Sequence, residues 1–535
     1  MSPAPGDRNL QRRLATLASA GAGSVLQGGL KGVEKESLRV TPDGFIAMTP
    51  HPRALGSALT NRYITTDYSE ALLELVTPTF NTTWELIAFL TDLHRFSYSA
   101  LGDELLWAAS MPCRIRSDDD VPIAVYGSSH AGQMKHVYRR GLGWRYGRRM
   151  QAISGVHFNY SFPRAFWEVL AGAEGAAADQ DFISAGYFAL LRNYRRFGWL
   201  VLYLFGVSPV VCGSFLTGMS DHGLEPFTRG TFIARHATSL RMSDLGYRNP
   251  AQSGVTVSVN SLDEYVRDLS RVVATPYPPY EKIGVKVDGE YRQLTTNILQ
   301  IENEYYSYIR PKRVTKSGES PTTALRSRGV EYVEVRALDV SPFDPVGVNQ
   351  NKLRFIEALL ALCVLKDSPP LDASAQRDVD ANQLQVARHG RDPKLRLRRG
   401  DQALSPAAWA GELLDEMQGL CEMLDAGDDS RPYAAALAVQ RNKLADPGLL
   451  PSARLVAELA RSDESFFELA LRTSIAHRDY FRDIYPVNPA RLAEFAAESR
   501  ASLARQARME ADDRGSFEDF LQHYYRAELD SRHKI

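Results

Sequence analysis

The sequence is poor in cysteine, has no surplus charge of either sign and begins without an apolar leader. Its four cysteines, Cys113, Cys212, Cys363 and Cys421, lie far apart and form no CxxC pair, which excludes a zinc ribbon and a disulfide-framed fold. Lysine and arginine number 63 against 64 acidic residues, for a formal net charge of −1. We therefore expect no general attraction to nucleic acid or to an anionic membrane. The first residues contain no apolar h-region, so we expect a cytoplasmic protein.

Long apolar runs are also scarce. The most apolar stretch, WLVLYLFGVSPVVCGSFL from Trp199 to Leu216, is about as long as a short membrane span. Gly206 and the pair Ser208-Pro209 interrupt it near its middle. This interruption favours a buried helix followed by a buried strand, and we expect no membrane contact.

The 535 residues exceed the length at which a single core usually keeps growing. Residues 1–366 mix helical and strand patterns, and we expect them to form one large core unit. Residues 367–403 are polar and punctuated by proline, which predicts a linker or long loop. Residues 404–535 show apolar residues three and four apart, which predicts a helical region packed on the core.

The fold class follows from the spacing of the strand candidates in the first part. They are separated by irregular distances and interleaved with helices such as the one expected from Thr82 to Leu101. A doubly wound parallel sheet has a regular alternation of strands and helices, which is not present. We therefore predict an α+β fold built on a largely antiparallel sheet.

One strand candidate, GVEKESLRV from Gly32 to Val40, places charge where a core residue is expected. Successive side chains of a strand point to opposite faces. Glu34 and Glu36 therefore share a face with Leu38 and Val40. Carboxylates at such positions are about 6.6 Å apart, and they repel by about 2.5 kcal/mol at an effective dielectric constant of 20.

Four further segments show acidic or polar residues in the same kind of setting. They are ISGVHFNYSFP with His157 and Asn159 on one face, VEYVEVRALDV with Glu334 and Arg336, TTDYSEALLELVTP with Asp67, Glu70 and Glu74, and NILQIENEYYSYI, read as a strand with Gln300, Glu302, Glu304, Tyr306 and Tyr308 on one face. A polar strand face is more often simply solvated, and a lone histidine is more often structural. The recurrence of carboxylates among aromatic and aliphatic residues favours a site.

Divalent cations relieve the repulsion among several gathered carboxylates. Mg²⁺ and Mn²⁺ prefer carboxylate oxygens, accept an imidazole and hold substrate phosphates. The pattern therefore predicts a phosphoryl-transfer site with several metal ions rather than a zinc site. No Walker A motif and no convincing dinucleotide GxGxxG occur, so a nucleotide would bind by another route.

Basic segments accompany these carboxylates. Residues 137–150, VYRRGLGWRYGRRM, and residues 309–320, IRPKRVTKSGES, each carry several arginines or lysines. The first segment is compatible with RNA binding, but the neutral chain favours a phosphate-facing loop or a solvated helix. Binding of the protein to RNA that weakens as salt is added would indicate the RNA-binding alternative.

Eight segments, in order from about residue 28 to 350, together resemble glutamate–cysteine ligase (gamma-glutamylcysteine synthetase) of the proteobacterial type. They are GVEKESLRV, ALGSALTNRYITTDYSEALLELVTP, LLWAASMPC, ISGVHFNYSFP, NYRRFGWLVLYLFGVSP, ATSLRMSDLGY, LQIENEYYSYIRPKR and VEYVEVRALDVSPFDPVGV. The resemblance implies a glutamine synthetase-like core whose curved sheet forms a funnel. It also implies ATP-dependent ligation of the γ-carboxylate of L-glutamate to the amino group of L-cysteine through γ-glutamyl phosphate, the first step of glutathione biosynthesis, by a monomer that uses Mg²⁺ or Mn²⁺.

The resemblance also assigns residues to roles. The implied metal ligands are Glu34, Glu36, Asp67, Glu74, His157 and Glu334. Arg139 and Arg336 are implied to contact the phosphates and, with Glu334, to be catalytic. The implied substrate-binding residues are Tyr138, Leu142, Gln151, Arg241, Tyr247 and Tyr306. Some members of the family have a cysteine pair, but Cys113 has no partner in residues 166–181, so control through that pair is not expected.

Two alternatives remain at the level of sequence. A related carboxylate–amine ligase could accept a different amine, because the pocket residues do not fix a small side chain. A metal-binding or nucleotide-binding protein without turnover would keep the same carboxylates, although the presence of Arg336 with the full acidic set argues against it.

Overall fold

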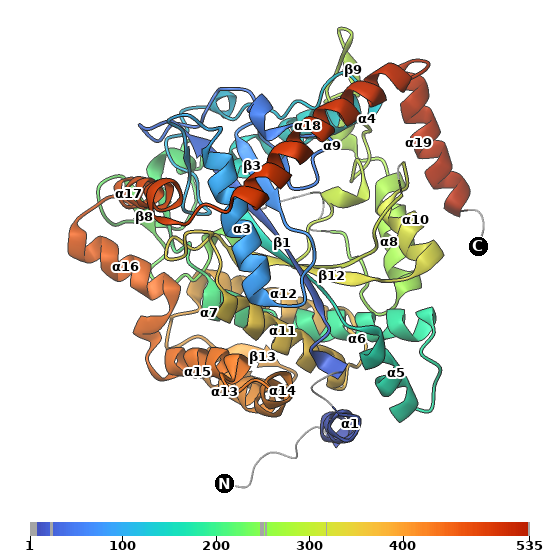
Figure 1. The fold of residues 1–535 in the computed structure, drawn as a ribbon, viewed down its shortest axis with the longest axis vertical. Coiled ribbons are helices and arrows are strands. Elements are labelled where there is room, and N and C mark those ends of the chain that lie inside the picture. Colours follow the sequence, from blue (N-terminus) through green and yellow to red (C-terminus); the bar gives the residue numbers. More distant parts are fainter. Residues whose placement is uncertain (1–7, 22–24, 247–250, 252–253, 317, 533–535) are drawn as a thin grey trace.

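A central antiparallel sheet organises the protein (Figure 1). The structure is a computed structural model that describes residues 8–21, 25–246, 251, 254–316 and 318–532. The strands of the sheet run in the order β11-β12-β5-β1-β3-β2, with β4 paired to β1. Their bounds are β1 (Leu30–Val40), β2 (Ile64–Thr66), β3 (Leu72–Val76), β4 (Leu105–Leu106), β5 (Gly155–Ser161), β11 (Ile309–Lys312) and β12 (Tyr332–Asp339). Neighbouring strands pair antiparallel, so the α+β fold with a largely antiparallel sheet is confirmed.

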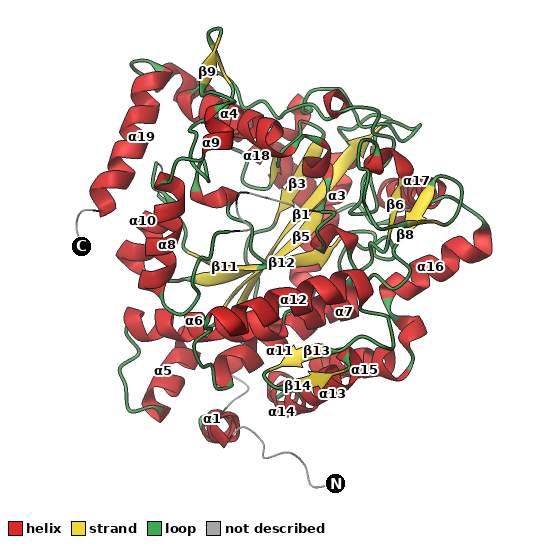
Figure 2. Ribbon diagram, turned by 180° about the vertical axis from the view of Figure 1, so that it is seen from behind, coloured by secondary structure: helices red, strands yellow, loops and turns green. Residues whose placement is uncertain are grey.

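The two faces of this sheet differ in chemistry. Val33, Leu73, Phe158 and Val335 belong to the main hydrophobic core. The helices that pack against this face are α3 (Thr83–Tyr98), α6 (Gln180–Phe197) and α7 (Trp199–Phe205), and α11 (Gln350–Leu365) packs on α3 and α6. Figure 2 shows α6, α7, α11 and α12 gathered along one side of the strands. The alternating residues between these apolar ones therefore point to the other face, because strand side chains alternate.

The apolar run at Trp199 has the structure that the interruption predicts. All residues of α7 are buried, and the buried strand β6 (Val210–Cys212) follows after a short turn. β6 pairs with β8 (Thr231–Ile233), which also pairs with β7 (Glu225–Pro226). Among the described residues, no helix has the length and apolarity that crossing a membrane requires.

The loop predicted for residues 367–403 is wrong in its central part. Helix α12 (Ala373–His389) occupies it, followed by the hairpin of β13 (Leu397–Arg399) and β14 (Gln402–Leu404). Val379 and Val386 are buried on one side of α12, and this helix packs against α7. A narrow apolar stripe is enough for a surface helix, and the Asp372 side chain caps its start by accepting from the Ala375 amide.

The described residues after 404 are mainly helical, as the apolar spacing of residues 404–535 predicts. The helices are α13 (Pro406–Glu416), α14 (Gln418–Leu424), α15 (Pro432–Ala445), α16 (Pro451–Ser462), α17 (Phe466–Asp479), α18 (Pro489–Asp512) and α19 (Phe517–Arg532). Ser405, Ser465 and Asn488 cap α13, α17 and α18 with their side chains. Helix α15 packs on α11, α18 crosses α3, and α19 reaches α4 (His130–Tyr146).

Shorter elements complete the described chain. They are α1 (Arg8–Ser19), α5 (Arg164–Ala173), α8 (Leu262–Ala274), α9 (Pro278–Glu281), α10 (Pro321–Arg328), β9 (Lys286–Val287) and β10 (Glu290–Tyr291). Of these, α8 and α10 pack against each other beside β11, and they shape part of the site described next.

Candidate active site

Four neighbouring strands bring the predicted carboxylates together on the face away from the main core. Glu34 of β1 lies opposite His157 of β5. On the other side of β1, Glu36 lies opposite Glu74 of β3. Glu334 of β12 lies opposite Asn159 of β5, so β5 connects the acidic residues of β1 with that of β12. The strand parity that predicts inward-facing glutamates at positions 34 and 36 is thereby confirmed.

The centre of this group has the spacing of a metal site. One ligand atom from each of Glu34, His157 and Glu334 lies within 4.8 Å of the other two. His157 Nδ1 is 3.2 Å from Glu34 Oε2 and 3.6 Å from Glu334 Oε1, and His157 Nε2 is 3.7 Å from Glu36 Oε1. One cation could therefore be reached by several of these side chains without a change of the backbone.

Hydrogen bonds from β5 hold two of the carboxylates. Asn159 Nδ2 donates to Glu34 Oε1 at 2.9 Å, and the Gly155 amide donates to Glu36 Oε2 at 2.6 Å. Each of these bonds uses one oxygen and leaves the other toward His157. Partners of this kind orient metal ligands and are part of the design of such sites.

Electrostatics divide the carboxylates into two groups. Burial and the charges of Glu34, Asp67 and Glu36 raise the pKa of Glu74 well above its usual value. Burial also raises the pKa of Glu36. Cationic neighbours are too few to neutralise this side of the cluster, which is the condition that a divalent cation relieves.

Glu334 has the opposite environment. Although burial opposes its ionisation, Lys312, Arg336 and other cations hold the pKa of Glu334 well below its usual range. Arg336 Nη1 is 3.0 Å from Glu334 Oε1, and Lys312 Nζ is 3.6 Å from Oε2. Glu334 is therefore a carboxylate at the physiological pH, and its buried Oε2 makes no hydrogen bond among the described residues.

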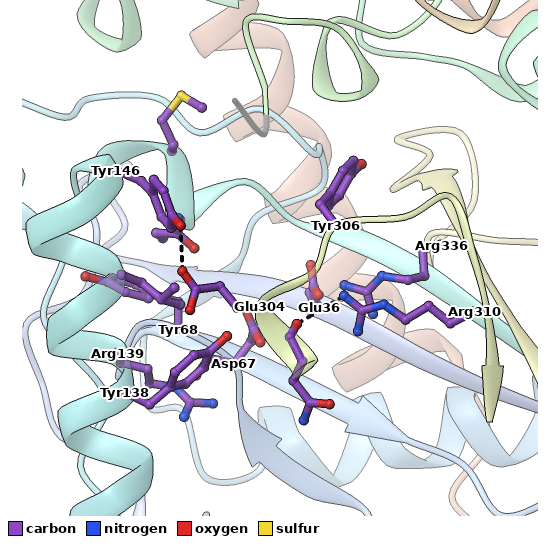
Figure 3. A pocket seen from close by; sticks show the side chains of 14 residues that line it. Glu36, Asp67, Tyr68, Tyr138, Arg139, Tyr146, Glu304, Tyr306, Arg310 and Arg336 are labelled. Atoms are coloured by element: carbon purple, nitrogen blue, oxygen red, sulfur yellow. Dashed lines mark hydrogen bonds between the residues drawn. The ribbon is translucent and has the colours of Figure 1, made fainter. Parts of the chain in front are cut away.

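A cavity opens beside Glu36 (Figure 3). It is lined by Glu36, Asp67, Tyr68, Tyr138, Arg139, Leu142, Tyr146, Met150, Gln151, Asn303, Glu304, Tyr306, Arg310 and Arg336. Tyr138 and Arg139 of α4 stand on one side, and Arg310 and Arg336 stand on the other. Eight of the predicted site residues line this cavity: Glu36, Asp67, Tyr138, Arg139, Leu142, Gln151, Tyr306 and Arg336.

Two predicted substrate residues do not lie on this wall. Arg241 is 2% exposed and lies beneath the cavity, where its Nη2 donates to the Arg336 carbonyl at 3.2 Å and its Nη1 is 3.9 Å from Asp339. The other, Tyr247, lies outside the described residues.

Residues 298–308 do not form the strand that their alternation predicts. They contain a short 3₁₀ turn, Glu302–Glu304, and the strand β11 begins only at Ile309. Glu304 explains the turn, because it accepts the Gln300 amide at 2.6 Å and forms a buried ion pair with Arg145 Nη1 at 3.0 Å. The carboxylate of Glu304 therefore supports the cavity wall, and Tyr146 donates to it as well (Figure 3).

Several residues of the site are absent from the predicted set. Asn159 holds Glu34, and Lys312 and Arg310 face Glu334 and the cavity. A signal for each exists in the sequence, since Asn159 shares the polar face of β5 with His157, and Arg310 and Lys312 belong to the basic segment after residue 308. The ion pair between Glu304 and Arg145 has no such signal, because the two residues come from distant segments of the chain.

A second cavity of about 290 Å³ lies between β11, α8 and α10. It is lined by Tyr265, Leu269, Glu302, Asn303, Arg310, Pro311, Lys312, Arg313, Val314, Thr315, Pro321, Thr322, Leu325 and Tyr332. Asn303 and Arg310 line both cavities. Glu34, Glu36, Glu74, His157 and Glu334 form an acid cluster that borders both cavities. Glu36 lines the first cavity, and Lys312, which lines the second, is 3.6 Å from Glu334.

Comparison with known proteins identifies the family. The family model of glutamate-cysteine ligase matches residues 14–386. The chain belongs to the glutamate–cysteine ligase family. The glutamate–cysteine ligase of Alcanivorax borkumensis is 49% identical over 524 residues, 97% of this chain and 99% of that protein. That of Azotobacter vinelandii is 50% identical over 517 residues, 96% and 97% of the two chains.

Solved structures agree with this assignment to the glutamate–cysteine ligase family. The crystal structure of the Francisella tularensis glutamate–cysteine ligase in complex with AMP matches with a TM-score of 0.88 and 37% identity, over 94% of this chain and 99% of that chain. A bifunctional glutathione synthetase from Pasteurella multocida shares the fold, with a TM-score of 0.71 and 23% identity over 91% of this chain and 58% of that one. The family predicted from the eight sequence segments is confirmed.

Proposed function

We propose that this protein is a glutamate–cysteine ligase, which uses ATP to join the γ-carboxylate of L-glutamate to the amino group of L-cysteine, the first step of glutathione biosynthesis. Relatives that carry this name are about half identical over nearly the whole chain. The structural observation that carries the proposal is the position of the acid cluster, which borders two cavities joined at Asn303 and Arg310. One cavity serves the amino acids and the other serves the nucleotide.

The acid cluster has the donor set of a site for Mg²⁺ or Mn²⁺. Its proposed ligands are Glu34, Glu36, Asp67, Glu74, His157 and Glu334. The buried Glu334 Oε2 without a hydrogen bond, and the repulsion that raises the pKa of Glu74, fit a bound cation. Ions held by these residues would supply positive charge to offset the negative charge that develops during phosphoryl transfer.

The nucleotide is assigned to the cavity between β11, α8 and α10. Arg310, Lys312 and Arg313 supply positive charge at its edge, and Tyr265, Leu269 and Tyr332 supply aromatic and aliphatic surface for a base. Adenine nucleotide binding is compatible with the AMP bound by the Francisella tularensis relative. The γ-phosphate would then point past Arg310 toward Arg336 and the amino-acid cavity.

The cationic side chains of the chain perform the electrostatic part of the reaction. The charges of Glu334, Glu36 and Glu34 outweigh burial and raise the pKa of Arg336, so its guanidinium stays charged. Arg336 on β12 stabilises the phosphoryl group in transfer, while Arg139 on α4 contacts phosphate from the other side. Glu334 orients Arg336 by accepting a hydrogen bond of 3.0 Å from its Nη1.

The reaction proceeds through γ-glutamyl phosphate. The γ-carboxylate of glutamate attacks the γ-phosphorus of ATP, and ADP leaves. The amine of cysteine then attacks the acyl carbon, and phosphate leaves, so that no protein nucleophile is required. Tyr138, Leu142, Gln151 and Tyr306 would orient the two amino acids, with Arg241 positioning from beneath.

The larger arrangement is proposed as follows. The sheet acts as a glutamine synthetase-like funnel with the metal ions inside, residues 1–366 form the catalytic unit, and residues 404–535 support it from outside. The proposed working form is a cytoplasmic monomer, as the family resemblance implies.

An ADP-release assay with glutamate and a panel of amines tests the proposed function. We expect strong release with L-cysteine, partial release with 2-aminobutyrate, which keeps the amino acid backbone but lacks the thiol, and little release with amines of other shapes. Equal release with every amine, or release that does not depend on glutamate, would contradict the proposal.

A further inference from the structure

A third cavity lies behind the helices that cover the apolar face of the sheet, and the segment predicted to be a linker forms much of its wall. It has a volume of about 460 Å³ and lies between α6, α12, α13 and the hairpin of β13 and β14. In Figure 2 these elements lie below the sheet, whereas α4, which lines the amino-acid cavity, lies above it. The volume is within the range of small-molecule sites, and the proposed ligase reaction does not use this cavity.

Part of the cavity wall is apolar and buried. It consists of Phe197, Leu371, Val379, Trp409 and Leu413, each at most 8% exposed. Phe197 and Trp409 meet edge to face, with their ring centroids 6.5 Å apart. A ligand that contacts this part of the wall would gain most from an apolar group.

Charged side chains surround this apolar surface, and several of them neutralise each other. Arg398 Nη1 is 3.6 Å from Asp378 Oδ1, and Arg399 pairs with Glu412. All four residues line the cavity. Because each of these charges already has a partner of opposite sign, none of them by itself favours a charged ligand.

Arg196 of α6 is a cation on this wall without such a partner. Its Nη2 donates to the Pro369 carbonyl at 2.6 Å, its Nη1 donates to Asn193 Oδ1 at 3.2 Å, and it forms no ion pair within the described part of the chain. Burial, and then the nearby Arg192, lower the pKa of Arg196 to about 10, so the guanidinium remains charged at neutral pH. A half-buried cation without a counterion favours an anionic group in the ligand.

Glu416 of α13 has the complementary property. Its Oε1 is 2.8 Å from Lys366 Nζ, but its buried Oε2 makes no hydrogen bond among the described residues. An unsatisfied buried acceptor is costly and favours an N–H donor in the ligand. Asn193 connects the two sites, because it accepts from Arg196 and donates to the Lys366 carbonyl at 3.1 Å.

We propose that this cavity binds a small zwitterion with an apolar side chain, of the class of the apolar α-amino acids. The carboxylate of the ligand pairs with Arg196, its ammonium group donates to Glu416 Oε2, and its side chain packs on Trp409 and Phe197. Each contact supplies the partner that the protein group lacks. None of these four residues lines either cavity of the proposed ligase site, so the zwitterion site is separate from it.

Helix α6 lies between this cavity and the proposed nucleotide site. It carries Asn193 and Arg196 on the cavity wall and packs against β11. Strand β11 carries Arg310 and Lys312, which line the proposed nucleotide cavity. Small shifts of packed helices transmit binding between sites, so we expect a ligand held by Arg196 to change the KM for ATP.

Isothermal titration calorimetry with four probes tests the zwitterion site. L-phenylalanine has all three recognised groups, whereas 3-phenylpropionate lacks the ammonium, 2-phenylethylamine lacks the carboxylate and glycine lacks the apolar side chain. The titrations contain saturating L-glutamate and L-cysteine without ATP, which occupy the amino-acid cavity. L-phenylalanine should bind at least about tenfold more tightly than each of the other three. No binding of L-phenylalanine, or equal binding of all four probes, would overturn the proposal.

Variants locate the bound probe. Arg196→Gln and Glu416→Gln should each weaken L-phenylalanine binding at least about tenfold. Arg196→Gln should also weaken 3-phenylpropionate but not 2-phenylethylamine, and Glu416→Gln should do the reverse. Asp415→Asn is the matched control, because Asp415 is exposed and pairs with Arg441 outside the cavity. Thermal unfolding checks the fold of each variant, and Arg196→Lys, which keeps the charge, should retain part of the affinity. Unchanged affinity in the folded glutamine variants would overturn the site.

Steady-state kinetics tests the connection through α6, and this readout rests on the proposed function. L-phenylalanine should change the KM for ATP at least about twofold in the unmodified chain and leave it unchanged in Arg196→Gln. A KM that does not respond in the unmodified chain would overturn only the connection through α6. Absence of ligation would refute the proposed function and leave the calorimetric result standing.

Discussion

Glu36 of β1 and Glu74 of β3 lie directly opposite each other in the antiparallel register. Like charges in this position are destabilising, and burial together with Glu34, Asp67 and Glu36 raises the pKa of Glu74. Two strands of the central sheet are thus held together at this point against electrostatic repulsion. We therefore expect a cation to occupy the site during function, because its charge would offset the repulsion between the carboxylates.

Replacement of Glu74 should therefore change stability and metal affinity in opposite directions. Above the ordinary pKa of a glutamate the unfolded chain loses this proton while the folded chain retains it, so the metal-free protein loses stability as pH rises from about 4.5. In EDTA, Glu74→Gln should raise the melting temperature more at pH 8 than at pH 5. The rise should be about 1 °C per kcal/mol of relieved repulsion for 535 residues.

Metal titration of the same variant completes this test. Glu74→Gln should bind Mg²⁺ or Mn²⁺ at least about tenfold more weakly, measured by calorimetry. The exposed Asp43 supplies a control, since Asp43→Asn should change neither quantity. Unchanged metal affinity in Glu74→Gln would remove this residue from the proposed ligand set.

Glu334→Gln should nearly abolish ligation while the fold remains. The variant loses a buried carboxylate that fixes Arg336, and a fall in kcat of about 100- to 1000-fold or more is expected. Glu331→Gln is the matched control, because Glu331 is exposed and lies just before the same strand. Circular dichroism should be the same for both variants, and near-normal turnover of Glu334→Gln would contradict the proposed role.

Adjacent arginines on α4 offer a second matched pair. Arg139 faces the cavity and is tied to the Asp67 carbonyl, whereas Arg140 pairs with the exposed Glu290 at 2.8 Å. Arg139→Lys should lower kcat/KM for ATP by about tenfold or more, because lysine cannot reproduce the guanidinium fork. Arg140→Lys should leave it within about twofold, and equal effects of the two changes would contradict a phosphate contact by Arg139.

Much of the site could be predicted because it depends on alternation within single strands. His157 and Glu334 each occupy the polar parity of a strand that is apolar on its other face, and Glu34 shares its parity with Leu38 and Val40, where a core residue is expected. The turn at Glu302–Glu304 could not be predicted, because it depends on Arg145 from α4.

The C-terminal helix α19 is a support for the substrate cavity that no motif indicates. Leu521 packs in a small core with Val137 and Leu294, and Tyr525 donates to the Gln300 carbonyl at 3.1 Å. Gln300 in turn donates to the Tyr138 carbonyl at 3.1 Å. These contacts link α19 to Tyr138, which lines the cavity.

Leu521→Ala should therefore weaken substrate binding more than it slows the reaction. A loss of about 1 kcal/mol in binding corresponds to about a fivefold rise in KM for an amino-acid substrate, with kcat little changed. Steady-state kinetics measures both. Ile484→Ala removes a side chain that is 70% exposed and should change neither parameter; a fall in kcat alone for Leu521→Ala would contradict a role in positioning Tyr138.

The transfer of oxygen from glutamate to phosphate tests the central claim most directly. L-glutamate labelled with ¹⁸O in its γ-carboxylate is turned over with ATP and L-cysteine, and the products are analysed by mass spectrometry. If the acid cluster and Arg336 direct attack of this carboxylate on the γ-phosphorus, one labelled oxygen appears in inorganic phosphate and the other stays in the γ-linked amide. Unlabelled phosphate, or label in AMP, would contradict the account.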